Sequence, residues 1–355
     1  MKTITFVCFI LYSISILSSC KKKEQHNEPI PYLPFSVYVA EEDEGGISVI
    51  DPIENKVIGT INISEDHSSM ALMPHNVQVA PDGKSIWVSA MAHEDGGMEQ
   101  LIVLDPVNNH KIIKRIDIGT HQHLGHVVLD DQSNYAFVTA GDANQVIQVD
   151  AHSYNVVKRF DLGAAHGPHG LRYHNGKLYV ANMEAKSMSI INIENGLITD
   201  VPLGGMGVQT AIGPDGQSVY VSLYDTKEVA KYDLQSQTLS KIALPAGALG
   251  PIQMYPTPDN KYLYICDQGA VEGDPISNKV YVLDIASSTI NHTIIAGEAT
   301  HGVVVSNDGQ KAFVTNTLSN TVSIIDVASQ SVTHTINVGK GPNGISFRYP
   351  SGGMK

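Results

Sequence analysis

Histidines are grouped in this chain in a way that could hold a metal ion. Three imidazoles fall within six residues, at His121, His123 and His126, and a second pair follows at His166 and His169. Imidazole nitrogen is a common ligand for zinc and copper in proteins. We therefore expect these histidines to form part of a metal site, with His121, His123, His126 and His169 as the primary ligands.

Methionines lie in the same kinds of loops as these histidines and favour one ion over the others. Imidazole together with thioether suits copper, because sulfur stabilises Cu(I), whereas zinc would be satisfied by histidine and carboxylate. Copper is therefore the preferred cofactor, and haem or another divalent metal is the alternative. The methionines concerned are Met70, Met73, Met91, Met98, Met183 and Met206.

A sevenfold repeat builds the elements that would position these residues. Each unit has a β-branched or aromatic run ending in a small or polar residue, a short loop, and a second run that closes on aspartate or, once, asparagine. A strand-only repeat of roughly 41 to 54 residues is typical of propeller blades. The first runs end at Ala40, Ser89, Thr139, Ala181, Ser222, Cys266 and Thr315, and the second at Asp51, Asp105, Asp150, Asn192, Asp233, Asp284 and Asp326.

The two ends of the chain carry complementary parts of one unit. The chain enters the repeat at Phe35 without an inner strand, and Pro342 to Phe347 reads as an inner strand with nothing after it. Pairing these segments would remove two open sheet edges. We therefore predict an all-β fold, a seven-bladed β-propeller with four-stranded blades, closed by the C-terminal strand that completes the first blade.

In such a fold the starts of the inner strands converge on the mouth of a central channel. His75 and His301 stand at this point in blades two and seven, and we expect them, with His166, to contribute ligands across the channel. The same position permits a purely structural role, because a histidine there can bond to backbone groups of a neighbouring blade without holding a metal.

The repeat resembles the YVTN-type seven-bladed propeller family, over about residues 35 to 348. The resemblance rests on Pro74 to Gly83, Ala312 to Asn316 and Asn320 to Asp326. Relatives by architecture include surface-layer proteins, lactonase-like enzymes and the propellers of nitrite and nitrous oxide reductases. The resemblance implies a fold strongly and a function weakly, because one propeller scaffold supports unrelated chemistries.

The N-terminus predicts export. Residues 1–19 read as a signal peptide, with an apolar stretch from Ile4 to Leu17 that is short for a membrane span. The small residues before Cys20 resemble a bacterial lipobox, which implies that Cys20 is lipidated. Residues 20–34 would then be a tether, 35–348 the propeller and 349–355 a C-terminal tail. We expect a lipid-anchored protein of the bacterial cell envelope, facing the periplasm or the exterior.

Charge and motif content narrow the functional classes. The formal net charge of −13 argues against a nucleic-acid partner, which would require a basic surface. The sequence has no Cys-x-x-Cys-His haem attachment motif and no Gly-x-Ser-x-Gly elbow. We predict a monomeric binding propeller that takes a metal ion or an envelope protein, with no enzymatic activity assumed. A redox propeller with copper or non-covalent haem, and a lactonase-like hydrolase, stay as alternatives.

Overall fold

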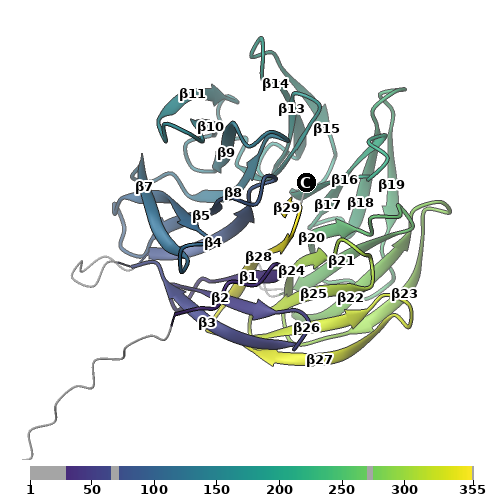
Figure 1. Cartoon of the computed structure of the whole chain (residues 1–355). Coiled ribbons are helices and arrows are strands. Elements are labelled where there is room, and N and C mark those ends of the chain that lie inside the picture. Colours follow the sequence, from purple (N-terminus) through teal and green to yellow (C-terminus); the bar gives the residue numbers. More distant parts are fainter. Residues whose placement is uncertain (1–28, 65–71, 270–274, 354–355) are drawn as a thin grey trace, which may run out of the picture.

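The computed structural model describes residues 29–64, 72–269 and 275–353, and within these ranges the chain is built from strands and turns (Figure 1). The predicted signal peptide 1–19, the predicted lipidation site Cys20 and most of the tether lie outside the described residues. In the described part, no helix is long and apolar enough to cross a membrane.

Seven antiparallel sheets are arranged as blades around a central axis (Figure 1), and in each blade the strands follow one another from the axis outward. Blade 1 contains β28 (Pro342–Tyr349), β1 (Ser36–Glu41), β2 (Gly46–Asp51) and β3 (Lys56–Asn62). Blade 2 contains β4 (Leu72–Val79), β5 (Ile86–Ala92), β6 (Glu99–Asp105) and β7 (Lys111–Gly119). Blade 3 contains β8 (Leu124–Leu129), β9 (Tyr135–Ala140), β10 (Gln145–Asp150) and β11 (Val156–Asp161).

The remaining four blades repeat this order. Blade 4 contains β12 (Pro168–His174), β13 (Lys177–Asn182), β14 (Ser187–Asn192) and β15 (Ile198–Pro202). Blade 5 contains β16 (Gly207–Ile212), β17 (Ser218–Leu223), β18 (Glu228–Asp233) and β19 (Leu239–Ala243). Blade 6 contains β20 (Pro251–Pro256), β21 (Tyr262–Gly269), β22 (Ile276–Asp284) and β23 (Thr289–Ile295). Blade 7 contains β24 (Thr300–Val305), β25 (Lys311–Asn316), β26 (Thr321–Asp326) and β27 (Ser331–Asn337). The predicted fold class is confirmed.

The ring closes where the sequence predicts it. Strand β28 pairs with β1, with Val37 opposite Phe347 and Val39 opposite Ile345. The tail adds a feature that the repeat did not predict, because β29 (Gly352–Gly353) turns back onto β28 and makes blade 1 five-stranded. The inner strands of neighbouring blades contact one another all the way around, including β28 with β4 and β24 with β28.

Apolar side chains gather mainly between blades. Seven buried clusters follow one another around the ring; for example, Trp87 of blade 2 and Val138 of blade 3 share one cluster. Phe313 of blade 7 and Phe347 of blade 1 share the cluster that lies at the closure. Burying strand faces against both neighbours removes apolar surface from water and fixes the angular position of each blade.

The repeated aspartate at the end of each third strand has a local structural role. Asp51 Oδ1 accepts hydrogen bonds from the amides of Ile53 and Glu54, 2.8 and 3.1 Å away. Asn192, which replaces the aspartate in blade 4, accepts an equivalent bond from the amide of Asn195. The aspartates that accept equivalent bonds are Asp105, Asp150, Asp233, Asp284 and Asp326. This side-chain cap satisfies amides that the outer turn leaves without strand partners.

Candidate metal centre

Three histidines from three consecutive inner strands meet at one mouth of the channel. His75 on β4, His126 on β8 and His169 on β12 each offer a ring nitrogen, and these nitrogens all lie within 4.8 Å of one another. The rings pack edge to face, with centroids 5.7 Å apart for His75 and His126, 5.4 Å for His75 and His169, and 5.1 Å for His126 and His169. Residues distant in sequence thus form one compact imidazole cluster, which we call the histidine trio.

Small residues allow the inner strands to come this close. A Cβ on Gly344 would lie 2.9 Å from the carbonyl oxygen of His75, and a Cβ on Gly302 would lie 2.5 Å from that of Asn343. Real Cβ atoms do not tolerate such distances, so a larger residue would force the blades apart at the mouth. Glycine at these positions is therefore a packing requirement of the ring.

The small or polar residue that ends each second strand links one blade to the next. Ser89 Oγ donates to the carbonyl of Gly125, and Thr139 Oγ1 donates to that of His169, 2.5 and 2.6 Å away. Cys266, at the matching position of blade 6, places its Sγ 3.7 Å from the carbonyl of Gly302. This buried cysteine therefore has a structural role between blades 6 and 7.

Hydrogen bonds orient the rings of His75 and His169. His169 Nδ1 lies 3.0 Å from the carbonyl of Val208, so Nδ1 carries the proton and the lone pair is left on Nε2. His75 Nδ1 faces the Glu42 carboxylate at 3.4 Å, and its buried Nε2 has no hydrogen-bond partner among the described residues. An imidazole with Nδ1 bonded outward and Nε2 unpaired is the arrangement that metal-binding histidines commonly adopt.

His126 has a different partner. The Gln209 side-chain oxygen accepts from the amide of Thr210 at 2.8 Å, which turns the Gln209 amide nitrogen toward His126 Nδ1, 3.0 Å away. Because that nitrogen donates, Nδ1 of the neutral ring accepts and Nε2 carries the proton. A metal ion at Nε2 would move this proton to Nδ1, and a metal ion at Nδ1 would replace the Gln209 amide, so either mode breaks the Gln209 hydrogen bond.

A fourth histidine lies beside the trio. His301 on β24 places Nδ1 2.9 Å from the Gln268 side-chain oxygen, and its buried Nε2 also has no hydrogen-bond partner among the described residues. It is the second residue of the inner strand β24, so it lies at the same mouth as the trio. Two unpaired buried ring nitrogens at one place are unusual, because buried polar atoms in proteins are normally hydrogen-bonded.

The environment keeps the imidazoles of His126, His169 and His301 neutral. Burial, followed by repulsion from neighbouring histidines, lowers the pKa of His126 well below its usual range. Burial and the neighbouring His75 lower the pKa of His169 to about 4, and the same causes lower that of His301 to about 3. Metal ions bind the neutral ring, so no deprotonation cost opposes binding at pH 7.

Glu42 supplies negative charge at the trio. Burial acts to raise its pKa, but the charge of His75 and hydrogen bonds from His75 and Asn343 outweigh burial and hold the pKa at about 2. The sequence patterns did not single out Glu42. It lies in the loop between β1 and β2, on the same face as the trio, and nothing in its local sequence marks it as a partner of His75.

The other predicted ligands lie outside the trio. His121 is exposed, and its Nδ1 lies 3.4 Å from the Asp95 carboxylate. His123 is also exposed, and its electrostatic repulsion contributes to the lowered pKa of His169. Both have positive φ, 53° and 51°, and neither ring belongs to the group of nitrogens that lie within 4.8 Å of one another.

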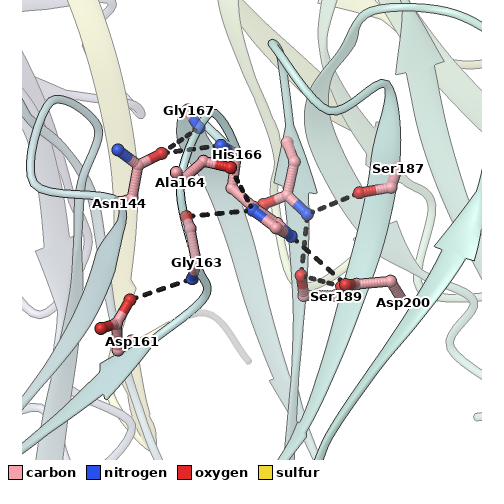
Figure 2. A network of polar contacts seen from close by, with 10 residues as sticks. Asn144, Asp161, Gly163, Ala164, His166, Gly167, Ser187, Ser189 and Asp200 are labelled. Carbon is pink, nitrogen blue, oxygen red and sulfur yellow. Dashed lines mark hydrogen bonds and ion pairs between the residues drawn. The ribbon is translucent and has the colours of Figure 1, made fainter.

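His166 belongs to a separate polar network (Figure 2). Its Nδ1 lies 3.1 Å from the carbonyl of Gly163 and 3.3 Å from that of Ala164, while Nε2 lies 3.2 Å from the Asp200 carboxylate. Asn144 accepts from the backbone amide of His166 at 2.7 Å. Both ring nitrogens are thus engaged in holding the loop between blades 3 and 4, which leaves neither directed at the trio.

Three of the predicted methionines pack among apolar side chains. Met73 and Met91 lie opposite each other on β4 and β5 and pack into the apolar cluster between blades 2 and 3. Met206 packs against the cluster of blades 6 and 7. Met70 lies outside the described residues. The thioether argument for Cu(I) therefore gains no support from Met73, Met91 or Met206, and the trio itself offers nitrogen donors with one nearby carboxylate.

The trio offers the donor atoms of a metal site, and its nitrogen–nitrogen separations are slightly larger than metal coordination requires. Tetrahedral coordination at 2.0–2.1 Å puts ligand nitrogens about 3.3 Å apart. The present separations of up to 4.8 Å would have to shrink by about 1.5 Å at most, which side-chain rotation can supply. The trio would supply three imidazole donors, and the Glu42 carboxylate would offset one of the two positive charges of a divalent ion.

Comparison with known proteins places the chain in an architectural class. No protein-family model and no curated protein matches it, so the YVTN-type assignment stays a prediction. Among solved structures, virginiamycin B lyase from Staphylococcus aureus is 15% identical, with a TM-score of 0.64 over 79% of this chain and 94% of that one. Hydrazine synthase from Kuenenia stuttgartiensis is 14% identical, with a TM-score of 0.68 over 82% and 96%.

A proposed 6-phosphogluconolactonase from Bacteroides fragilis is similar to the same degree, with 13% identity and a TM-score of 0.66 over 88% of this chain and 97% of that one. At such low identity these structures show the fold alone. The protein is a seven-bladed β-propeller with a histidine trio at one mouth of its channel.

Proposed function

We propose that the protein is a metal-binding propeller of the cell envelope, and that His75, His126 and His169 hold a divalent late transition metal at the channel mouth. The observation that carries the proposal is the buried, unpaired Nε2 of His75, which lies beside the rings of His126 and His169 that burial keeps neutral. His301 and Glu42 flank the trio and would complete or orient the coordination shell.

Copper remains the preferred ion, in its Cu(II) state. Nitrogen donors bind Cu(II) more tightly than other divalent first-row ions, and zinc follows as the ion best suited to three imidazoles in tetrahedral geometry. The role proposed for the trio is binding rather than catalysis, because the unpaired nitrogens support capture of an ion and point to no defined reaction.

The test is metal titration of the protein after dialysis against a chelator, with Cu(II), Cu(I) and Zn(II) as probes. We expect one Cu(II) per chain with a dissociation constant below about 1 μM, and an electron paramagnetic resonance spectrum split by several nitrogens. His126→Gln and His169→Gln should each weaken binding at least tenfold. The matched control is the double variant His121→Ala/His123→Ala, which should bind normally.

Two results would overturn the assignment. Loss of the metal in the His121/His123 double variant but not in His126→Gln would move the site to the exposed loop. If the unmodified protein retains none of the three ions at micromolar concentration, the trio has a structural role and does not bind metal.

Gln209 provides a sharper test of the ring geometry. Its amide donates to His126 Nδ1, so metal capture at His126 has to break this hydrogen bond. Removing the donor in Gln209→Ala should therefore raise metal affinity roughly fivefold, the value of one neutral hydrogen bond of about 1 kcal/mol. A decrease in affinity would indicate that Gln209 supports the bound state instead.

Membrane attachment through Cys20 is the second part of the proposal, and it rests on the lipobox-like segment before that residue. Radiolabelled palmitate should be incorporated into the full chain in a bacterial host and should be lost in Cys20→Ala, with the variant released from the membrane fraction. Unlabelled protein that still sediments with membranes would contradict lipid anchoring at this residue.

A further inference from the structure

The opposite mouth of the channel holds a second candidate site. A cavity of about 460 Å³ opens there between the inner strands and the turns that follow them. Its walls include Arg172 of β12, Tyr255 of β20, Ile212 of β16 and Tyr349 of β28. This volume is within the usual range for small-molecule pockets. Because β12 runs through the channel, His169 near its start lies at the first mouth and Arg172 lies toward the second.

Arg172 is the unusual residue of this cavity. Its guanidinium makes one hydrogen bond, from Nη1 to the carbonyl of Leu171 at 3.0 Å, and the described residues offer no carboxylate within ion-pair distance. A guanidinium carries five N–H donors, so most of those of Arg172 have no hydrogen-bond partner among the described residues. Burial lowers the pKa of Arg172, yet arginine stays charged in proteins. The wall of the cavity therefore carries a positive charge that has no ion-pair partner among the described residues.

The surroundings of Arg172 are aromatic and hydroxyl-bearing. Tyr255 is half-buried, interacts electrostatically with Arg172 and with Tyr349, and has its pKa raised to about 12 by burial, so its hydroxyl is a donor at neutral pH. Tyr173 adds a third ring to the lining. A guanidinium beside phenol hydroxyls and ring faces matches an anionic head group attached to a flat apolar body.

We propose that this cavity binds a small organic anion, with its carboxylate or phosphate on Arg172 and its ring or apolar body against Tyr255, Tyr349 and Ile212. The exposed carboxylate of Asp131 at the rim disfavours extended polyanions, so the ligand should carry its charge at one end only. This site shares no residue with the histidine trio, so anion binding does not depend on whether the trio holds a metal.

The test uses three probes of similar shape, benzoate, phenyl phosphate and neutral benzamide, in calorimetric titrations of the protein. We expect benzoate or phenyl phosphate to bind with a dissociation constant in the millimolar range or tighter, and benzamide to bind at least tenfold more weakly because it lacks the charge. Preference between the two anions identifies the head group. This comparison requires no variant and is therefore unaffected by folding defects.

Variants then locate the charge. Arg172→Gln should weaken binding of the anion at least tenfold. Arg159→Gln is the matched control, because Arg159 also bonds a backbone carbonyl, that of Ile118, but lies on the outer strand β11. The proposal is overturned if neither anion binds up to about 10 mM, if benzamide binds equally well, or if Arg172→Gln binds as tightly as the unmodified protein.

Discussion

Acid should destabilise the metal-free protein through the buried histidines, in a pH range set by their pKa values. His169 and His301 titrate near 4 and near 3 in the folded state and near 6.5 when unfolded. As the pH falls below 6.5, the unfolded chain takes up these protons first, so the folded state loses stability until its own pKa is reached. Above pH 6.5 neither histidine changes stability.

The size of the effect follows from these values. At pH 5.0 each histidine costs about 2 kcal/mol, since one pKa unit corresponds to about 1.4 kcal/mol and the pH lies about 1.5 units below 6.5. Solvent screening at the channel mouth reduces the total to about 2 to 4 kcal/mol. Glu42 does not contribute at pH 5.0, because its stabilising effect is lost only as the pH falls from 4.5 toward 2.

Urea unfolding of chelator-treated protein at pH 7.5 and pH 5.0 measures this loss directly. His301→Gln removes one titrating group and should reduce the difference between the two free energies of unfolding by about 1 to 2 kcal/mol. His292→Gln, an exposed histidine on the outer strand β23, is the control and should leave the difference unchanged. If His301→Gln and His169→Gln both lose as much stability as the unmodified protein, the buried rings are not the acid-sensitive groups.

Three further outcomes concern the blades themselves. Gly302→Ala should cost about 2 to 3 kcal/mol in a thermal or urea unfolding experiment, because its Cβ would meet the carbonyl of Asn343; an unchanged midpoint would show that the closure tolerates a wider gap. Asp51→Ala should cost about 1 to 2 kcal/mol through the lost cap on the turn amide of Ile53, and Asp51→Asn should recover most of it. The buried thiol of Cys266, whose pKa burial raises well above its usual value, should react with a thiol reagent only at the rate of unfolding; fast labelling of the native protein would contradict its burial.

The fold was predictable because the same pattern of strands and turns recurs seven times in the sequence. Residue pairs such as Asn175-Gly176 and Asp215-Gly216 mark hairpins whose glycines do adopt positive φ, 73° and 67°. The half-unit at each end could pair only with the other. The short return strand β29 was not predictable, because its two glycines carry no periodic signal.

The sequence predicted which strands carry the candidate site, but it did not predict which side chains point into it. Residues at the starts of inner strands, His75, His126, His169 and His301, do meet at one mouth, since the ring geometry alone brings them together. The close spacing of the histidines also predicted His121 and His123 as ligands. The backbone angles of the loop decide where these side chains point, and residue spacing does not encode those angles. Partners such as Glu42 and Gln209 come from other blades and have no local signature.

The seam between β1 and β28 also sets the order in which the molecule can be completed. Val39 pairs with Ile345, so nearly the whole chain has to be present before the ring can close. His75 faces both Glu42, just after β1, and Asn343 on β28, which are the two sides of that seam. The blades can therefore fold one after another as the chain appears, but the surroundings of His75 are finished only by the final strand. An ion captured at the channel mouth would bind the closed ring in preference to open intermediates. It would therefore stabilise the product of the last folding step against reopening of the seam.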